Sequence, residues 1–365
     1  MKKRVLDTKV SRRKVFAGAA AAGLTAGIGA APAIAAQATA EKAKIAALPE
    51  VWGQDFLYQW SPPANVKRDL TAGPQYIRLS SQSTPRLTGE AGVNYDQLFK
   101  SMRDGGFMAC EAASAGWLAR KMPESEKQEI KKQLKAHDVV FYGIHCAGNI
   151  IAPDPDAERW QRHIIDAIHS ADEMGCQLIL THVGSMYPNR NWAHPLNWSR
   201  EAWQRSVNAL KNIAKATAGS KVEIAIEPVN TESLNNPWAQ VRLREDVGDP
   251  RIMSGLDITN MVFPHTAFRM TELLNTAFDL LGDQIAYVHA KDFEWNSMLP
   301  GMNWAMNGTG NMDYETFLTR ISRLKRPTNM LIEFLTTNEE YQQAQRNIRA
   351  IAAKVGVKIH GTQPA

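Results

Sequence analysis

Short apolar runs and longer segments of helical periodicity alternate along the chain from about Gln75 onwards. The apolar runs are rich in β-branched residues, which is typical of buried strands. The segments between them repeat hydrophobic positions with the spacing of an amphipathic helix. Eight runs are predicted as strands: Tyr76–Ser80, Phe107–Glu111, Val139–His145, Gln177–His182, Val222–Glu227, Met253–Asp257, Ala286–His289 and Met330–Phe334.

Local signals mark where several of the predicted helices begin. Ser125 with Gln128, and Thr337 with Glu340, fit the capping box, in which two side chains satisfy backbone amides at a helix start. Pro237 suits the first turn of a helix, where a missing amide hydrogen removes no hydrogen bond. Helices are therefore expected after the second, fifth and eighth strands at these positions.

The alternation of strands and helices also predicts how the sheet is connected. No hairpin signal separates two consecutive strands, so we expect each strand to lie parallel to the next. Eight parallel strands closed on themselves form a (β/α)8 TIM barrel, the predicted α/β fold for residues 75–365. The alternative is an open, doubly wound sheet, which usually has a glycine-rich turn after its first strand. The sequence RLSSQSTPRL has no such turn.

The first 35 residues have the features of an export signal. Arg12 and Arg13 precede a run rich in alanine and glycine, and Ala33-Ile34-Ala35 fits a cleavage site. This pattern predicts a twin-arginine signal peptide, recognition by the twin-arginine export machinery, and a periplasmic or secreted protein. A retained membrane anchor is disfavoured because the run is poor in large apolar residues. Residues 36–74 are interpreted as an N-terminal lead segment.

The positive charge of the chain belongs to this signal. The whole chain has a formal charge of +5, whereas residues 1–35 hold seven basic residues and one acidic residue, so the remainder carries −1. A near-neutral mature chain argues against a nucleic-acid partner, which requires a basic surface. Three cysteines, an odd and low count for an exported protein, argue against a disulfide framework.

Polar residues end most of the predicted strands. In a TIM barrel these ends meet on one face, where active sites lie. Buried carboxylates on that face would require a cation among them. The residues are Glu111, His145, His182, Glu227, Asp257, His289 and Glu333.

Four of these residues, supplied by consecutive strands, are candidate metal ligands: Glu227, Asp257, His289 and Glu333. Three carboxylates and one imidazole suit one divalent ion, with Mn²⁺ as the first choice and Co²⁺, Mg²⁺ or Zn²⁺ as alternatives. Any one of the four alone could be an ordinary solvated or ion-paired side chain. As a set from neighbouring strands, they predict a metal site.

The ordered motifs IAIEPVN, SGLDITN, YVHAKD and LIEF resemble those of the xylose-isomerase-like barrel superfamily. This group includes sugar isomerases, ketose 3-epimerases, inosose dehydratases and apurinic endonucleases. The resemblance implies that the same four residues bind one divalent metal and that Glu227 and Glu333 exchange protons with a sugar. One position departs from the family pattern, because Asn260 stands where Asp-x-x-His often has its histidine. This departure argues against the endonuclease branch.

A metal between two glutamates suits removal of a proton next to a carbonyl group. Return of the proton to the opposite face gives epimerisation, and return to the neighbouring carbon gives aldose–ketose isomerisation. We therefore predict a sugar isomerase or epimerase. A lyase or hydratase that acts on a 3-keto-glycoside or an inosose shares the first step and remains an alternative. A sugar-binding barrel without catalysis is an alternative of another class.

The predicted substrate is a small, non-phosphorylated carbohydrate. We find no glycine-rich phosphate loop, and aromatic side chains near the seventh strand could stack on a sugar. A homo-oligomer is possible, although no exposed stripe decides it. The residues expected to contact substrate are His145, His182, Glu111, Asn260, Lys291, Trp295 and Trp304.

Overall fold

The computed structural model describes residues 75–82, 87, 89–296 and 301–361. The chain divides into two units, Met1–Val51 and Trp52–Ala365, and every described residue belongs to the second. The predicted export signal and lead segment lie outside the described residues. Within the described residues, every helix is too short or too polar to cross a membrane.

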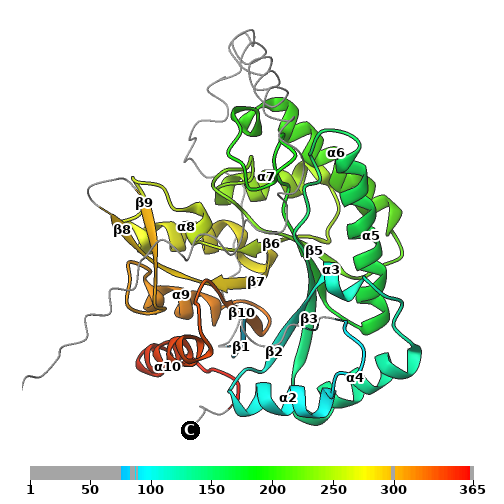
Figure 1. Cartoon of the computed structure of the whole chain (residues 1–365). Helices are drawn as coiled ribbons and strands as arrows, with labels where there is room; N and C mark the ends of the chain where they lie inside the picture. Colours follow the sequence, from blue (N-terminus) through cyan, green and yellow to red (C-terminus); the bar gives the residue numbers. More distant parts are fainter. Residues whose placement is uncertain (1–74, 83–86, 88, 297–300, 362–365) are drawn as a thin grey trace, which may run out of the picture. The chain divides into compact units, whose positions relative to one another are not determined.

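Eight parallel strands form a nearly closed barrel, as predicted, with helices on its outside (Figure 1). They pair in the order β1-β10-β7-β6-β5-β4-β3-β2. The strands are β1 (Ile77–Ser81), β2 (Ala109–Ala113), β3 (Val140–Cys146), β4 (Leu178–Thr181), β5 (Glu223–Ile226), β6 (Ile252–Leu256), β7 (Ile285–Ala290) and β10 (Thr328–Ile332).

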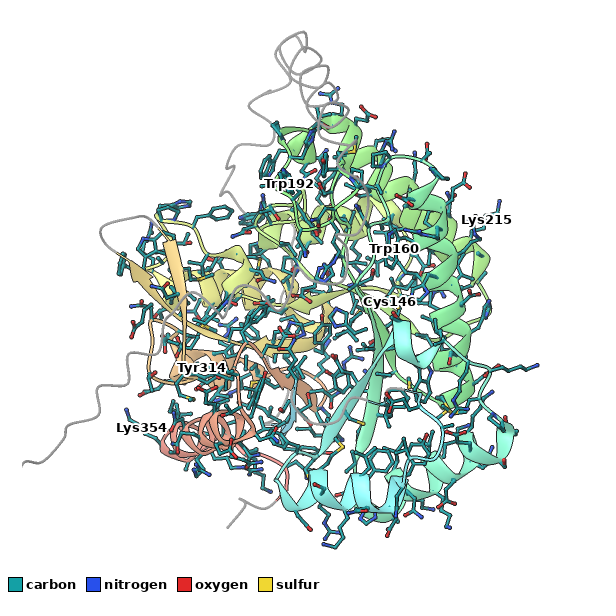
Figure 2. The ribbon with its side chains drawn as sticks, viewed as in Figure 1. Cys146, Trp160, Trp192, Lys215, Tyr314 and Lys354 are labelled. Carbon is teal, nitrogen blue, oxygen red and sulfur yellow. The ribbon has the colours of Figure 1, made fainter. Side chains whose placement is uncertain are left out.

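The helices between the strands bury their apolar faces against the sheet and expose their charged faces. Lys354, for example, points away from the barrel at the end of the last helix (Figure 2). The α-helices are α2 (Tyr95–Asp104), α3 (Ser114–Trp117), α4 (Glu124–His137), α5 (Asp156–Met174), α6 (Arg200–Ala216), α7 (Pro237–Val247), α8 (Met270–Leu281), α9 (Tyr314–Ile321) and α10 (Asn338–Lys354). Three short 3-10 helices are η1 (Pro195–Trp198), η2 (Thr259–Met261) and η3 (Gly282–Gln284).

The first strand, β1, is hydrogen-bonded to segments from both the early and the late parts of the barrel sequence. It pairs with β10. It is also bonded to the residue that precedes β2, since the amide of Met108 donates to the carbonyl of Leu79 at 2.9 Å. At its beginning, Ile77 accepts from the amide of His360 at 2.8 Å and donates to the carbonyl of Lys358 at 2.9 Å. The C-terminal residues thus complete the barrel next to its first strand.

An antiparallel hairpin follows β7, which corrects the expectation that no hairpin is present. Its strands are β8 (Asp292–Asn296) and β9 (Gly301–Ala305), and Phe293 lies opposite Trp304. The carboxylate of Asp292 fixes the segment that returns from the hairpin towards α9. It accepts hydrogen bonds of 2.8–3.0 Å from the amides of Phe293, Gly308, Gly310 and Met312.

Two tyrosines inside the barrel connect its core to the strand ends. Tyr142 and Tyr287 are fully buried with leucine and alanine side chains from neighbouring strands. The Tyr142 hydroxyl donates to Glu111 at 2.9 Å, and the Tyr287 hydroxyl donates to Glu227 at 3.4 Å. Gly255 makes room for Tyr287, since a β-carbon at this position would overlap the tyrosine ring. The packed core therefore positions carboxylates above it.

Candidate active site

The structure brings together the four predicted metal ligands. Nδ1 of His289 lies 3.3 Å from Oε1 of Glu227, 3.4 Å from Oδ2 of Asp257 and 3.2 Å from Oε2 of Glu333. All four side chains are buried, none with more than 5% of its surface exposed. Three buried carboxylates therefore surround one imidazole on the C-terminal face of the barrel.

The ends of the strands explain this convergence. Glu227, Asp257 and Glu333 each follow immediately after the last residue of β5, β6 or β10. His289 is the penultimate residue of β7 and lies opposite Leu331 of β10. Parallel pairing places these positions at one level, so their side chains meet without any distortion of the backbone.

The donor atoms fit one divalent cation. One ligand atom from each of the four residues lies within 4.8 Å of all the others. This spacing is compatible with metal–ligand bonds of about 2.1 Å. Because the donors are oxygen and imidazole nitrogen, they suit an ion of intermediate hardness, as expected from the sequence.

Lys291 supplies a positive charge to the same centre. Its ammonium group contacts the carboxylate of Asp257 and lies 3.1 Å from Oε2 of Glu333 and 3.9 Å from Oε1 of Glu227. Burial alone would lower the pKa of Lys291, but the neighbouring carboxylates outweigh burial and raise this pKa above its usual value. Burial would likewise lower the pKa of His289, and the charges of Glu227 and Glu333 hold it well above its usual value.

Asn260 contacts two of the candidate ligands. Its side-chain amide donates to Oε1 of Glu227 at 2.9 Å, and its backbone amide donates to Oδ1 of Asp257 at 3.2 Å. The hydroxyl of Thr259 donates to the same Asp257 oxygen at 2.6 Å. The 3-10 helix η2 therefore orients two carboxylates by hydrogen bonds.

His145 and His182 lie beside the carboxylate cluster and form a second possible ligand group with Glu227. Nε2 of His182 lies 3.7 Å from Oε2 of Glu227. Burial, with a smaller contribution from Arg190, lowers the pKa of His182 well below its usual value, so its ring is neutral near pH 7. Glu111 lies within β2 rather than at its end, and its Oε1 is 3.6 Å from Nδ1 of His145. His145 and His182 can offer ring nitrogens to a substrate.

The predicted aromatic residues differ in their surroundings. Trp304 is 42% exposed and stacks on Phe334, with ring centroids 4.5 Å apart. Trp295 is half-buried and packs against the core beneath the hairpin. On the loop after β4, Trp192 is 56% exposed and packs beside Tyr187 (Figure 2). Trp304 is thus better placed than Trp295 to meet a ligand.

The sequence of this chain matches the xylose isomerase-like TIM barrel family over residues 99–353, a range that contains all four candidate ligands. The chain belongs to this family. No curated protein matches its sequence closely enough to count as a relative.

Solved structures of low sequence identity share the fold of this family member. A D-psicose 3-epimerase with D-fructose is 16% identical, with a TM-score of 0.58 over 76% of this chain and 99% of that chain. A 3-keto-D-glucoside 4-epimerase from E. coli is 13% identical, with a TM-score of 0.55 over 77% and 99%. A xylose isomerase-like TIM barrel protein from Mycobacterium smegmatis, in complex with magnesium, is 11% identical, with a TM-score of 0.55 over 79% and 100%.

Sequence reasoning missed several residues around the site of this family member. Tyr287 and Thr259 each donate to a candidate ligand, and Gln82 donates to Oε1 of Glu333 at 3.4 Å. Phe334 was included only as the end of a strand. No local pattern marks Phe334, whose backbone adopts a left-handed conformation held by Gln82.

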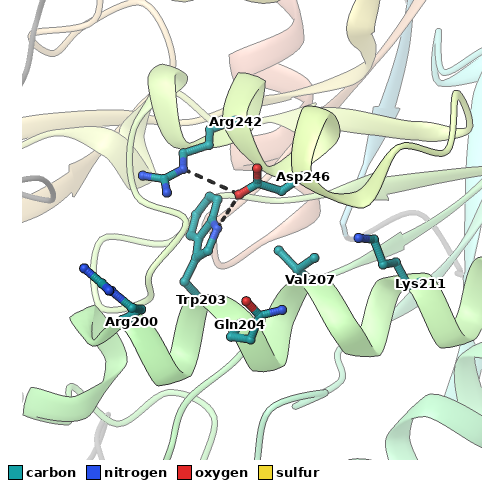
Figure 3. Close-up of a pocket in the computed structure, with 7 residues that line it drawn as sticks. All are labelled: Arg200, Trp203, Gln204, Val207, Lys211, Arg242 and Asp246. Carbon is teal, nitrogen blue, oxygen red and sulfur yellow. Dashed lines mark hydrogen bonds and ion pairs between the residues drawn. The ribbon is translucent and has the colours of Figure 1, made fainter.

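A groove of about 450 Å³ lies on the outside of the barrel between α6 and α7 (Figure 3). Trp203 forms its wall, donating to Asp246 at 2.7 Å beneath the guanidinium of Arg242. None of its lining residues comes from a strand end. We interpret the groove as a packing feature of the two helices, separate from the candidate active site.

Proposed function

We propose that this protein is an exported, divalent-metal-dependent isomerase or epimerase of a non-phosphorylated sugar or keto-sugar. The observation that carries the proposal is the pairing of Glu227 and Glu333 around one position, since both lie within 3.3 Å of the same nitrogen of His289. Two carboxylates on opposite sides of a bound carbon can remove a proton and return one.

Glu227, Asp257, His289 and Glu333 would hold the metal, with Mn²⁺ as our first choice. A bound divalent ion would polarise the sugar carbonyl and stabilise negative charge on its oxygen. The magnesium complex of the M. smegmatis family protein supports a divalent ion. The two carbohydrate epimerases of the same fold support the substrate class.

Each glutamate presents one oxygen to the cation position and has the other held by a neutral donor. Oε2 of Glu227 accepts from Tyr287, and Oε1 of Glu333 accepts from Gln82. In the proposed reaction, Glu227 takes the proton next to the carbonyl, and the C–H electron pair enters the C–C bond as the carbonyl pair moves to oxygen. Glu333, which must carry a proton when the substrate binds, then delivers that proton to carbon as the enediolate oxygen pair re-forms the carbonyl. Glu333 is left ionised and Glu227 protonated, and exchange with solvent restores both. Fixed carboxylates require little reorganisation during these transfers.

A β-elimination is the second candidate reaction. The same proton is removed, and the bond to a substituent on the next carbon breaks instead. A leaving hydroxyl requires a proton, and the buried ammonium of Lys291, 3.1 Å from Glu333, is a cationic donor within the site. A 3-keto-glycoside or an inosose would be the substrate of such a lyase.

Exchange of substrate hydrogen with deuterium oxide tests the proposal. Mature protein loaded with Mn²⁺ is screened against free ketoses, aldoses and 3-keto-glycosides by NMR, while elemental analysis measures metal per chain. We expect Glu227→Gln and Glu333→Gln each to slow exchange about 10³-fold. Glu245→Gln, an exposed glutamate on α7, serves as the matched control.

Unchanged exchange in both glutamine variants would exclude these residues as acid and base. Sugar binding without exchange in the wild-type protein, for every metal tried, would instead support the sugar-binding barrel. The predicted signal in residues 1–35 is tested separately, by fractionation of cells that carry Arg12→Lys/Arg13→Lys. We expect the mature protein to be lost from the exported fraction.

A further inference from the structure

Two large aromatic rings lie partly in water at the mouth of the site. Trp304 comes from β9 of the hairpin, and Phe334 directly follows the ligand Glu333. Their rings stack at 4.5 Å with an interplanar angle of 21°, yet 42% of Trp304 and 46% of Phe334 remain exposed. Exposure of so much apolar surface is unfavourable, so a ligand that covered the rings would gain binding energy.

The backbone of Phe334 is held in a conformation that disfavours its own side chain. Its φ is +63°, in the left-handed region, where a bulky residue is strained and a glycine is not. Gln82 maintains this conformation, because its side-chain oxygen accepts from the Phe334 amide at 3.2 Å while its amide group donates to Glu333. Strained residues of this kind cluster at ligand sites. The position of the ring is therefore coupled to the position of a candidate metal ligand.

Lys291 joins the aromatic pair to the carboxylates. Its ammonium nitrogen lies 4.4 Å from the centroid of the Phe334 ring and 5.8 Å from that of Trp304. The same nitrogen lies 3.1 Å from Oε2 of Glu333. The ammonium group of Lys291 thus lies next to both the carboxylates and the aromatic rings, and the carboxylates neutralise its charge. The outer surface of the pair offers aromatic faces to a ligand.

Resting on the proposed function, we propose that the Trp304–Phe334 pair binds the second ring of a neutral glycoside or disaccharide whose first ring lies at the carboxylates. The apolar C–H face of a sugar stacks on aromatic rings. In this proposal the ring that stacks on the pair is distinct from the ring at the carboxylates, because the Lys291 ammonium lies next to both, 3.1 Å from Glu333 and 4.4 Å from the Phe334 ring centroid. The substrate class is therefore a glycoside with two rings rather than a free monosaccharide.

Calorimetric titration of the Mn²⁺-loaded protein tests the subsite without any turnover. The probes are cellobiose, maltose, trehalose and sucrose, compared with methyl α- and β-D-glucoside. We expect at least one disaccharide to bind more tightly than the methyl glucosides. Trp304→Ala and Phe334→Gly should each lower that preference about tenfold. Phe334→Gly keeps the left-handed backbone, and Phe268→Ala removes another exposed ring as a control.

An unchanged preference in both variants, or no binding of any disaccharide, overturns the subsite. Dissociation of an oligomer on Trp304→Ala, measured by light scattering, also overturns it, because the rings would then belong to a subunit contact. Deuterium exchange separates this proposal from the proposed function. Exchange that depends on Glu227, with no disaccharide preference, defeats the subsite alone. A preference that depends on Trp304, with no exchange, defeats the proposed reaction alone.

Discussion

The ammonium nitrogen of Lys291 lies 3.1 Å from Oε2 of Glu333, among the carboxylates that would bind a metal. In the protein without metal, this contact offsets part of the negative charge of three buried carboxylates. A divalent ion placed between the same carboxylates would repel the ammonium. Lys291 and the metal therefore compete to neutralise the same three carboxylates.

Lys291→Met should strengthen metal binding and weaken the metal-free fold. At a dielectric constant of about 20, a unit charge and a divalent ion on the order of 4 Å apart repel by several kcal/mol, so removal of the Lys291 charge should raise Mn²⁺ affinity at least about tenfold. Loss of a buried partner should destabilise the metal-free protein by about 3–5 kcal/mol. Calorimetric titration and urea unfolding measure the two effects. Lys354→Met, which removes an exposed ion pair with Glu315, should change neither by more than about 1 kcal/mol.

Gly255→Ala should damage both the core and the site. The added methyl group would overlap the Tyr287 ring, whose hydroxyl donates to Glu227. Overpacking of this kind typically destabilises by about 1–3 kcal/mol. Tyr287→Phe should keep the stability of the core within about 1.5 kcal/mol and slow exchange by altering the orientation of Glu227. Urea unfolding checks the first effect, with Gly219→Ala, which has open space around it, as the control. Equal stability of the two alanine variants would contradict this packing.

Asp292→Ala should release the segment that follows the hairpin. Four backbone amides donate to this carboxylate and would be left without their acceptor. Because hydrogen bonds to charged groups contribute about 1.5–3 kcal/mol each, we expect faster proteolysis between β9 and α9 and a lower melting temperature. Limited proteolysis with mass spectrometry locates the cuts. A wild-type cleavage pattern would show that the four bonds do not hold this segment.

Glu232 should make stability depend on pH. Burial raises its pKa to about 8, from 4.5 in the unfolded chain, so between these pH values the folded state binds a proton that the unfolded state has lost. Stability should then fall with rising pH across this window, by about 1.4 kcal/mol per unit from this group. Glu232→Gln removes the slope and should be more stable than wild type at pH 8.5. Parallel melting curves from pH 5 to 9 would contradict this, and Glu245→Gln is the exposed control.

The sequence predicted the barrel well because each strand and each helix has a distinct hydrophobic period. All eight predicted strands overlap observed ones. Local capping signals were less dependable. The capping box of Thr337 and Glu340 is present, whereas α4 begins at Glu124, before Ser125, and Gln128 donates to the Glu124 side chain instead.

The four candidate ligands could be predicted from the sequence because parallel strands end on one face of the barrel, whatever their exact register.

The hairpin was missed because Asp292–Asn296 alternates in polarity without a two-residue turn signal after it. Tyr287 and Phe334 depend on features that no local pattern encodes. One reaches Glu227 through the barrel interior, and the other adopts a left-handed backbone held by Gln82.

The backbone bonds of Ile77 to Lys358 and His360 have a consequence for the order of synthesis. The first strand leaves the ribosome early, yet it pairs with β10 and with residues near the end of the chain. Its backbone therefore lacks these partners until Lys358 and His360 have been synthesised. Folding of the barrel can finish only after these residues have emerged from the ribosome, and the ligand Glu333 joins the other three only at that late stage.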